Sequence, residues 1–164
     1  MIAKTMSRRS FVGLAGGGSL ALLALGSAGA RANGVRFAVN HAPPQWRQLL
    51  GPQRYAVLRE ASTERPYSSP LLKEHRKGTF VCAGCGLPLF SSETKFESGT
   101  GWPSFWKPLD HAVVTRSDHG LGMERTEVLC ARCGGHLGHV FDDGPKPTGL
   151  RYCMNGLALS FRAA

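Results

Sequence analysis

The pattern of hydrophobic and polar positions predicts helices at the beginning of the folded part of the chain. Trp46, Leu49 and Leu50 recur at helical spacing behind Pro43-Pro44, and proline is tolerated in the first turn of a helix. Gly51-Pro52 should end this helix. Short helices are therefore expected at residues 43–50, 53–60 and 71–77.

Beyond Gly78 the pattern changes to short apolar runs separated by Gly, Pro, Asn and Asp. Leu157, Leu159 and Phe161 alternate with other residues, as they should on a half-buried strand. Strands are expected at residues 79–81, 87–90, 94–96, 112–117, 124–129, 137–141, 151–154 and 157–161. Short strands with regular turn residues predict a mainly β fold, in which two antiparallel sheets form a small sandwich or open barrel behind the short N-terminal helices.

Length and composition are those of one globular domain. The chain has 164 residues, of which 42% are hydrophobic and 19% charged, and these values exclude a disordered chain. We assign the domain to residues 43–164. Residues 33–42 are expected to be a linker or an early strand, because Val35, Phe37 and Val39 alternate.

Residues 1–32 have the layout of a bacterial export signal. The basic pair Arg8-Arg9 precedes an apolar region at residues 11–30, and a small-residue cleavage site follows at residues 28–32. The sequence SRRSFV at residues 7–12 resembles a twin-arginine signal, whose pathway carries folded proteins. We expect the signal to be cleaved and the protein to be periplasmic. The alternatives are an ordinary secretory signal and an uncleaved anchor, since a spanning helix needs about 20 apolar residues.

The charge of the chain does not indicate a nucleic-acid partner. Four of the 20 basic residues and none of the 11 acidic ones lie in residues 1–32, so the net charge of +9 falls to +5 without this segment. No run of Lys and Arg is interleaved with aromatic residues. Contact with a membrane is expected only through the export signal, if it is not cleaved.

Two C-x-x-C units, Cys82 to Cys85 and Cys130 to Cys133, predict a metal clip. Two-residue spacing lets both thiolates of a unit reach one ion, and two units complete a closed tetrahedral site. We expect one structural Zn²⁺ per chain, although thiolates also bind iron. The alternatives are two disulfides, and a thioredoxin-like redox pair, which would require a strand-to-helix setting rather than glycine-rich turns.

The fifth cysteine, Cys153, is the thiol that remains for chemistry. Arg151 lies two residues away on the same face of the expected strand, and a nearby cation favours the reactive thiolate. His136 and His139 could lie across the sheet from it. The alternatives are a buried inert cysteine, and histidines that are structural or bind a second metal ion.

Five motifs follow one another along the chain: GWPSF, RTEV, HLGHVF, DGP and RYC. Together with the surrounding segments 78–105 and 122–155, they resemble the B-type methionine-R-sulfoxide reductases, and the similarity covers roughly residues 43–161. The resemblance implies two antiparallel sheets with short N-terminal helices. It also implies an oxidoreductase that reduces the R epimer of methionine sulfoxide, chiefly in peptides and proteins, and so repairs oxidised proteins.

The resemblance assigns roles to single residues. Cys153 matches the nucleophile, and Trp102 matches the aromatic wall against which the methyl group of the sulfoxide packs. The residues that match the zinc ligands are Cys82, Cys85, Cys130 and Cys133.

The polar residues of the motifs are expected around the thiol and the sulfoxide. His136, His139 and Arg151 match groups at these positions, while Asp143 and Asn155 match motif residues that we place in substrate binding. A sulfoxide sulfur is a poor electrophile until its oxygen is protonated, and a histidine is suited to that step. We expect His139 to be the acid, His136 to place substrate or water, and Arg151 to favour the thiolate.

Thr100 departs from the family pattern, because many members have a recycling cysteine at this position. Once four of the five cysteines bind zinc, Cys153 has no internal partner for a disulfide. We therefore expect the sulfenic acid on Cys153 to be reduced by an external thiol, such as a thioredoxin-like protein. Gly156 also replaces a serine expected after Asn155, and we attach no function to this change.

Two other classes of function share some of these features. A zinc-ribbon binding module without catalysis would explain the two C-x-x-C units but not the five motifs or Cys153. A thiol–disulfide oxidoreductase would use one C-x-x-C unit, and zinc bound at one ion per chain would exclude it.

Overall fold

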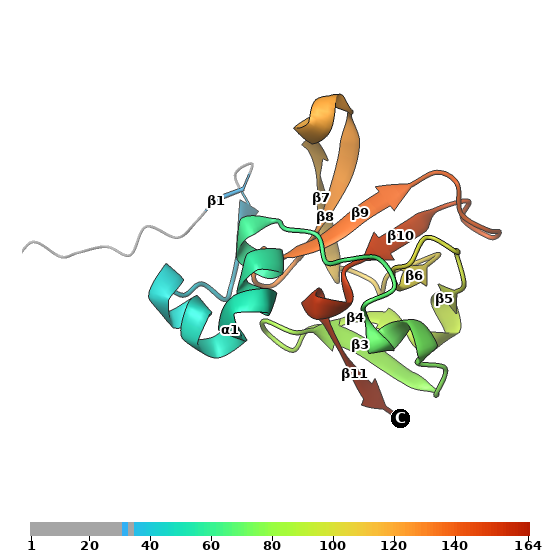
Figure 1. Ribbon diagram of the computed structural model, residues 1–164, viewed down its shortest axis with the longest axis horizontal. Coiled ribbons are helices and arrows are strands. Elements are labelled where there is room, and N and C mark those ends of the chain that lie inside the picture. The colour runs from blue at the N-terminus through green and yellow to red at the C-terminus, as the bar shows by residue number, and fades with distance from the viewer. Residues whose placement is uncertain (1–30, 33–34) are drawn as a thin grey trace, which may run out of the picture.

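The computed structural model describes residues 31–32 and 35–164, so the export signal expected at residues 1–32 lies almost entirely outside the described residues. The strands form two principal antiparallel sheets, of six and three strands, which confirms the mainly β fold expected from the sequence (Figure 1). A small ribbon of β1 (Arg31–Ala32) and β2 (Val35–Arg36) precedes them.

The six-stranded sheet carries most of the residues of interest, and every neighbouring pair in it is antiparallel. Its strands, in spatial order, are β5 (Lys95–Phe96), β6 (Ser104–Phe105), β10 (Arg151–Met154), β9 (His136–Phe141), β8 (Arg125–Cys130) and β7 (Val113–Asp118). The long hairpin of β7 and β8 extends away from the body of the molecule (Figure 1).

The three-stranded sheet has β3 (Gly78–Cys82) in its centre, between β11 (Leu159–Ala163) and β4 (Pro88–Ser91). Phenylalanines from both sheets meet in the core between them. Phe105 of the large sheet stacks on Phe90, with ring centroids 4.4 Å apart, and meets the edge of Phe80 at 4.9 Å. Full burial of each such ring contributes about 1.5–3 kcal/mol, so this contact joins the two sheets into one core.

The helix α1 (Pro43–Glu60) contains the break that Gly51-Pro52 predicts. Gly51 has φ 68° and ψ 172°, a left-handed conformation that glycine adopts without strain, and it divides the element into two helical segments. Trp46 and Leu58 are buried under the helix, whereas Leu49 is 62% exposed. The expected pair of short helices is thus present, although one of the three apolar positions used to predict the first does not face the core.

Four 3₁₀ turns complete the secondary structure: η1 (Pro70–Lys73), η2 (Ser92–Thr94), η3 (Gly120–Gly122) and η4 (Gly156–Ala158). The helical turns expected at residues 71–77 are realised only in η1. The strand expected at residues 157–161 begins at Leu159 instead, because the carboxylate of Glu64 binds the backbone N–H groups of Gly156 and Leu157 and holds them in η4.

Residues 35–42 are attached more closely to the domain than a linker would be. The N–H of Val39 donates to the carbonyl of Arg132 over 3.0 Å, and the His41 ring meets the edge of Trp46. Among residues 31–32 and 35–164, no helix has the length and apolar character needed to span a membrane.

Candidate active site

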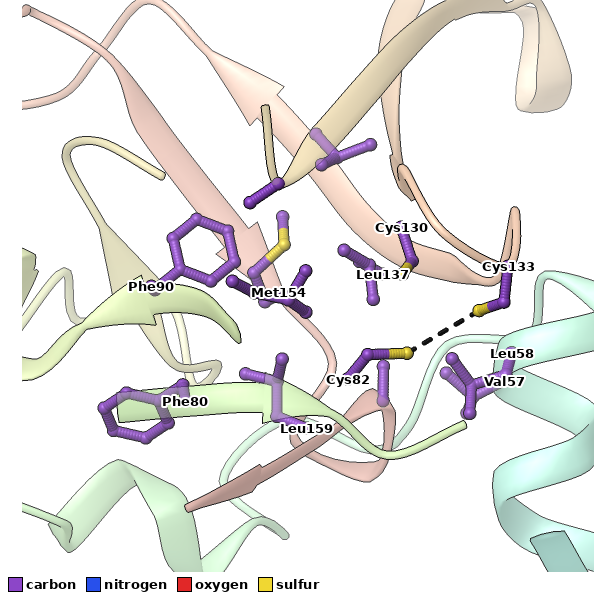
Figure 2. Close-up of a cluster of buried hydrophobic side chains, with 14 of the residues drawn as sticks. Val57, Leu58, Phe80, Cys82, Phe90, Cys130, Cys133, Leu137, Met154 and Leu159 are labelled. Carbon is purple, nitrogen blue, oxygen red and sulfur yellow. Dashed lines mark hydrogen bonds between the residues drawn. The ribbon is translucent and has the colours of Figure 1, made fainter. Parts of the chain in front are cut away.

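The four cysteines of the C-x-x-C units converge on one point at the end of the core. Their sulfur atoms lie within 4.8 Å of one another. Cys82 ends β3 and Cys130 ends β8, so the two principal sheets each contribute one unit (Figure 2). The closest sulfurs belong to different units: Cys82 and Cys133 are 3.7 Å apart, and Cys85 and Cys130 are 3.5 Å apart.

These distances fit a tetrahedral metal site. Zn–S bonds of about 2.3 Å place the sulfurs of a tetrahedron about 3.8 Å apart, close to the spacing observed. The sulfurs are too far apart for disulfides, in which they lie about 2.05 Å from each other. Because four crowded thiolates repel one another unless a cation neutralises them, the chemistry of the donor set also fits a bound metal ion.

Glycines shape the turn of each unit. Gly86 has φ 71° and donates its N–H to the carbonyl of Cys82 over 2.8 Å, and Gly134 has φ 65° and makes the same bond to Cys130. A side chain would be strained at these positive φ values. The glycine behind each C-x-x-C unit therefore lets the chain turn so that both sulfurs point to one place.

Cys153 lies in a row of polar residues that crosses the large sheet. It is directly opposite His139 on β9, and His139 is directly opposite Glu127 on β8. On its other side Cys153 faces Ser104 of β6. Opposite residues on antiparallel strands point to the same face of the sheet, so the register places a carboxylate, an imidazole, a thiol and a hydroxyl side by side.

The thiol of Cys153 is half-buried and contacts the hydroxyl of Thr100, at a distance of 3.8 Å between Sγ and Oγ1. Burial raises the pKa of Cys153, although the Thr100 hydroxyl and the Arg151 guanidinium oppose this rise. Arg151 thus acts in the direction expected from the sequence, but burial outweighs it. The resting group at neutral pH is the thiol.

Arg151 is fixed in place from two sides. Its Nε and one terminal nitrogen each donate to the carboxylate of Asp143 over 2.8 Å, and its guanidinium lies over the ring of Phe141, 4.4 Å from the centroid. The hydrogen bonds from Arg151 lower the pKa of Asp143. Asp143 does not line the cavity of Cys153 described below, and its contact with the site runs through Arg151.

His139 is held on a carboxylate that the sequence did not reveal. Its Nε2–H donates to Oδ2 of Asp118 over 2.8 Å, and Arg125 donates to the same oxygen over 2.6 Å. Hydrogen bonds from Gly120 and His139 hold the pKa of Asp118 far below its ordinary value, so this carboxylate accepts and leaves Nδ1 of His139 as the acceptor nitrogen. Burial lowers the pKa of His139, which makes the neutral imidazole its form at pH 7.

His136 lies in a neighbouring environment. It is buried, its Nδ1–H donates to Oε1 of Glu127 over 2.6 Å, and Glu127 also binds Arg116. The rings of His136 and His139 are 5.5 Å apart, but His136 lines a second cavity, next to α1, and not the one that contains Cys153. The structure therefore places His139 in the same cavity as the thiol, whereas His136 lies outside this cavity.

A cavity of about 140 Å³ opens over Cys153. One water needs about 10–15 Å³ of such volume, so the cavity has room for one side chain. The residues that line it are Thr63, Trp102, Arg125, Gly138, His139, Phe141, Cys153 and Asn155. Trp102 and Asn155, both expected from the sequence to bind substrate, are among them.

Glu64 does not line this cavity but binds two residues that do, and the sequence did not indicate this role. Its carbonyl accepts from Nε1 of Trp102 over 3.2 Å, and its N–H donates to Oδ1 of Asn155 over 3.0 Å. Its carboxylate binds the N–H groups of Gly156 and Leu157. A single acidic residue in a polar loop carries no pattern that would predict these contacts, which span 38 residues of sequence to Trp102 and 91 to 93 residues to Asn155, Gly156 and Leu157.

The structure also explains Gly156. A Cβ atom at this position would lie 1.9 Å from Oγ of Ser69 and 2.4 Å from its Cβ. The space that a side chain at residue 156 would need is therefore filled by Ser69, the N-cap residue of η1.

Fold and site together define the class of the protein. A half-buried thiol faces a neutral imidazole across neighbouring strands, an indole ring closes the same small cavity, and the remaining cysteines form a separate site that could hold a metal ion. This is the arrangement of a thiol-dependent oxidoreductase on a β fold with a separate four-cysteine site that could hold a metal ion.

The chain belongs to the SelR-domain family, the B-type methionine sulfoxide reductases, since the SelR domain matches residues 50–163. Three relatives named peptide methionine sulfoxide reductase MsrB show the extent of the similarity. The protein of Leptospira interrogans is 53% identical, and the alignment covers 78% of this chain and 98% of the relative. The protein of Bradyrhizobium diazoefficiens is 61% identical, with 70% of this chain and 84% of the relative covered. The protein of Methanosarcina barkeri is 52% identical, with 76% of this chain and 89% of the relative covered. The family and the enzyme class inferred from the five motifs are confirmed.

Proposed function

We propose that this protein reduces the R epimer of methionine sulfoxide in peptides and proteins to methionine. The observation that carries the proposal is the cavity in which the thiol of Cys153, the imidazole of His139 and the ring of Trp102 meet. Relatives that bear the name of a peptide methionine sulfoxide reductase, and that match 70% or more of this chain, support it.

The protonation states favour a proton transfer from the thiol to the sulfoxide oxygen. Cys153 keeps its proton at neutral pH because its pKa is raised, and His139 is neutral because its pKa is lowered. Nδ1 of His139 takes the proton as the sulfur of Cys153 attacks, and then donates it to the oxygen of the sulfoxide. In this scheme His139 is the acid expected from the sequence, and the proton that it donates comes from the thiol of Cys153.

The reaction balances without a further reagent. Sγ of Cys153 attacks the sulfur of the sulfoxide, the sulfur–oxygen bond of the substrate breaks, and the oxygen is transferred with the proton to Cys153. The products are methionine and a sulfenic acid on Cys153. The sulfur of the substrate is reduced by two electrons, and the sulfur of Cys153 is oxidised by two.

The walls of the cavity account for selection of one epimer. Trp102 is fixed by the hydrogen bond from Nε1 to the carbonyl of Glu64, so its ring offers a rigid apolar surface to the methyl group of the substrate. His139 lies opposite Cys153 and is the group that receives the sulfoxide oxygen. In the other epimer the methyl group and the oxygen exchange places. The methyl group would then lie against the imidazole of His139, and the oxygen against the indole of Trp102.

The sulfenic acid is recycled by an external thiol. Thr100 stands beside Cys153 and cannot form a disulfide, and the other four cysteines gather in the separate cluster. One thiol of the reductant condenses with the sulfenic acid, which gives a mixed disulfide and water, and a second thiol then releases Cys153. A dithiol protein of the thioredoxin type supplies both thiols.

The metal of the four-cysteine cluster is zinc, and its role is structural. Cys82, Cys85, Cys130 and Cys133 would hold it, and with four protein ligands no position remains for water or substrate. The ion stabilises the fold when bound, and the sulfoxide chemistry belongs to the residues of the Cys153 cavity.

The protein is exported to the periplasm through its twin-arginine-type segment. The support is the sequence of residues 7–12 and the apolar stretch behind it. A metal centre whose ligands come from two sheets forms only in the folded chain, and a pathway for folded proteins would protect its thiols from mispairing. A fusion of residues 1–32 to a reporter that folds before export should reach the periplasm, and replacing Arg8-Arg9 by Lys-Lys should retain it in the cytoplasm.

The proposed reaction is tested by an assay on both epimers. The purified enzyme is supplied with the R or the S epimer of N-acetyl-methionine sulfoxide and with dithiothreitol or thioredoxin, and formation of methionine is followed. Turnover of the R epimer alone is expected. Turnover of the S epimer alone, or of neither, would refute the proposal.

A further inference from the structure

A groove of about 780 Å³ lies beside the Cys153 cavity and shares Trp102 with it. Residues 67–75 form one wall, and residues 97–102 form the other. The volume is within the range of about 300–1,000 Å³ that is usual for ligand sites. The catalytic cavity has room for one side chain, so the residues next to a methionine sulfoxide in a polypeptide must lie outside it.

The groove is built around an exposed, fixed tyrosine. Tyr67 is 70% exposed and has φ 63°, a conformation that residues other than glycine rarely adopt. Two hydrogen bonds hold it: its N–H donates to the carbonyl of Gly101 over 2.7 Å, and its hydroxyl donates to the carbonyl of Gly99 over 2.6 Å. An exposed aromatic side chain that is already ordered loses little entropy when a partner covers it, and tyrosine is enriched at such surfaces.

Gly101 permits this packing and connects it to the catalytic cavity. A Cβ atom on Gly101 would lie 2.8 Å from Cβ of Pro66 and 3.0 Å from Cε2 of Tyr67, so no larger residue fits without displacing the tyrosine. The next residue along the chain is Trp102, which lines both spaces. A chain whose sulfoxide lies in the catalytic cavity therefore passes Trp102 directly into the groove.

One lysine and one glutamate line the groove, and only the glutamate is in an ion pair among the described residues. Lys73 lines it, is exposed, and makes no ion pair within the part of the chain that the structure describes. The one acidic residue of the groove, Glu97, is paired with Lys95 over 3.2 Å. An acidic side chain in the groove would therefore be attracted to Lys73, while the pairing of Glu97 with Lys95 weakens the opposing repulsion from Glu97.

We propose that this groove binds the residues that flank methionine sulfoxide in a polypeptide substrate, and that Lys73 makes it favour acidic flanks. The inference rests on the proposed function and adds to it a preference among substrates. It follows from the shared wall at Trp102, the ordered Tyr67 and the unpaired Lys73.

The test compares two nonapeptides with a central methionine-R-sulfoxide, one flanked by aspartates and one by lysines. The wild-type enzyme should have the higher kcat/KM for the aspartate peptide. Lys73→Glu should change the ratio of the two kcat/KM values by about tenfold toward the lysine peptide at low salt, and less at high salt. Lys107→Glu, which makes the same charge change outside the groove, should keep the wild-type ratio.

Binding of the same peptides to the Cys153→Ser variant, followed by fluorescence anisotropy, separates the groove from the chemistry. Lys73→Glu in this background should shift the ratio of the two dissociation constants in the same direction. An unchanged ratio, or an equal shift with Lys107→Glu, would overturn the proposal for the groove. Lack of turnover of every R-sulfoxide by the wild-type enzyme would instead refute the proposed function, and the binding measurement would still decide the role of the groove.

Discussion

The five cysteines of this protein lie in two regions that differ in the chemical groups around each thiol. In the metal cluster, four sulfurs from two sheets lie within 4.8 Å of one another, and three of the four residues are buried. In the catalytic cavity, a single half-buried thiol lies among an imidazole, a hydroxyl and a guanidinium. The neighbours of each thiol, rather than the residue type, distinguish the four cysteines that could hold a metal ion from the one that we propose as the nucleophile.

The two regions are nevertheless connected through β9. This strand begins at His136, directly after the unit of Cys130 and Cys133, and His139 is three residues further on. The metal cluster therefore fixes the start of the strand that places His139 opposite Cys153. We therefore expect the four-cysteine cluster to influence the reaction only by positioning β9.

Removal of the metal should have the largest effect. Structural zinc contributes about 10–16 kcal/mol to folding in small peptides, which is comparable to the about 5–15 kcal/mol stability of a whole domain. A chelator that strips the metal, or the variant Cys130→Ser, should unfold the domain, as measured by circular dichroism together with metal analysis. Cys153→Ser should keep both the metal and the melting temperature. An unchanged melting curve in metal-free protein would contradict this assignment.

His139→Gln should have the next largest effect, and it is confined to the cavity. Loss of a positioned acid–base group lowers kcat/KM by about 10²–10⁴-fold. His136→Gln is the matched control. It should lower kcat/KM less and instead destabilise the protein by about 1–3 kcal/mol, because it removes the hydrogen bond between the buried side chains of His136 and Glu127. A greater loss of kcat/KM with His136→Gln than with His139→Gln would reverse the roles proposed here.

The pH dependence of kcat/KM should report the two groups that share the proton. Below the pKa of His139, which burial lowers from about 6.5, the imidazolium cannot accept the thiol proton, and the rate should fall about tenfold per pH unit. Above the pKa of Cys153, which burial raises, the transferable proton is lost and the rate should fall again. The profile should be flat from about pH 6.5 to 8.5. A rate that rises steadily through this range would show that the attacking species is the small thiolate fraction, which grows with pH, and not the thiol acting with neutral His139.

Thr100→Cys should change the oxidised product more than the rate. The hydroxyl of Thr100 lies 3.8 Å from Sγ of Cys153, so a thiol at residue 100 is close enough to attack a sulfenic acid there. With dithiothreitol the rate of sulfoxide reduction should change little. After one turnover without reductant, mass spectrometry should find a disulfide between residues 100 and 153, and its absence would show that the loop cannot bring the two sulfurs together.

Patterns that are local in sequence were the ones that could be predicted. The spacing of the C-x-x-C units gave the metal cluster, and Gly51-Pro52 gave the break in α1, because the physical cause lies within a few residues of the pattern. Strand β6 (Ser104–Phe105) was missed, since two residues show no alternation. The alternation of apolar residues includes Leu157 and so predicts that it belongs to the strand. In the structure its N–H binds Glu64 instead, and β11 begins two residues later.

Partners that are distant in sequence could not be predicted. Asp118 fixes the tautomer of His139 across 21 residues, and Glu64 ties Trp102 to Asn155 across much larger separations. An isolated acidic residue in a loop or at the end of a strand resembles any solvated surface residue. Only the register of β7, β8 and β9, and the path of the loop around residue 64, bring these carboxylates to the site.

The most direct test of this account is to trap the oxidised form of Cys153. The metal-loaded enzyme is given one equivalent of methionine-R-sulfoxide peptide without any thiol, then a sulfenic-acid reagent, and the labelled peptides and bound metal are measured. The account predicts one label per chain, on Cys153, with the metal fully retained. A disulfide between Cys153 and one of the four clustered cysteines, with release of the metal, would contradict the separation of the two regions.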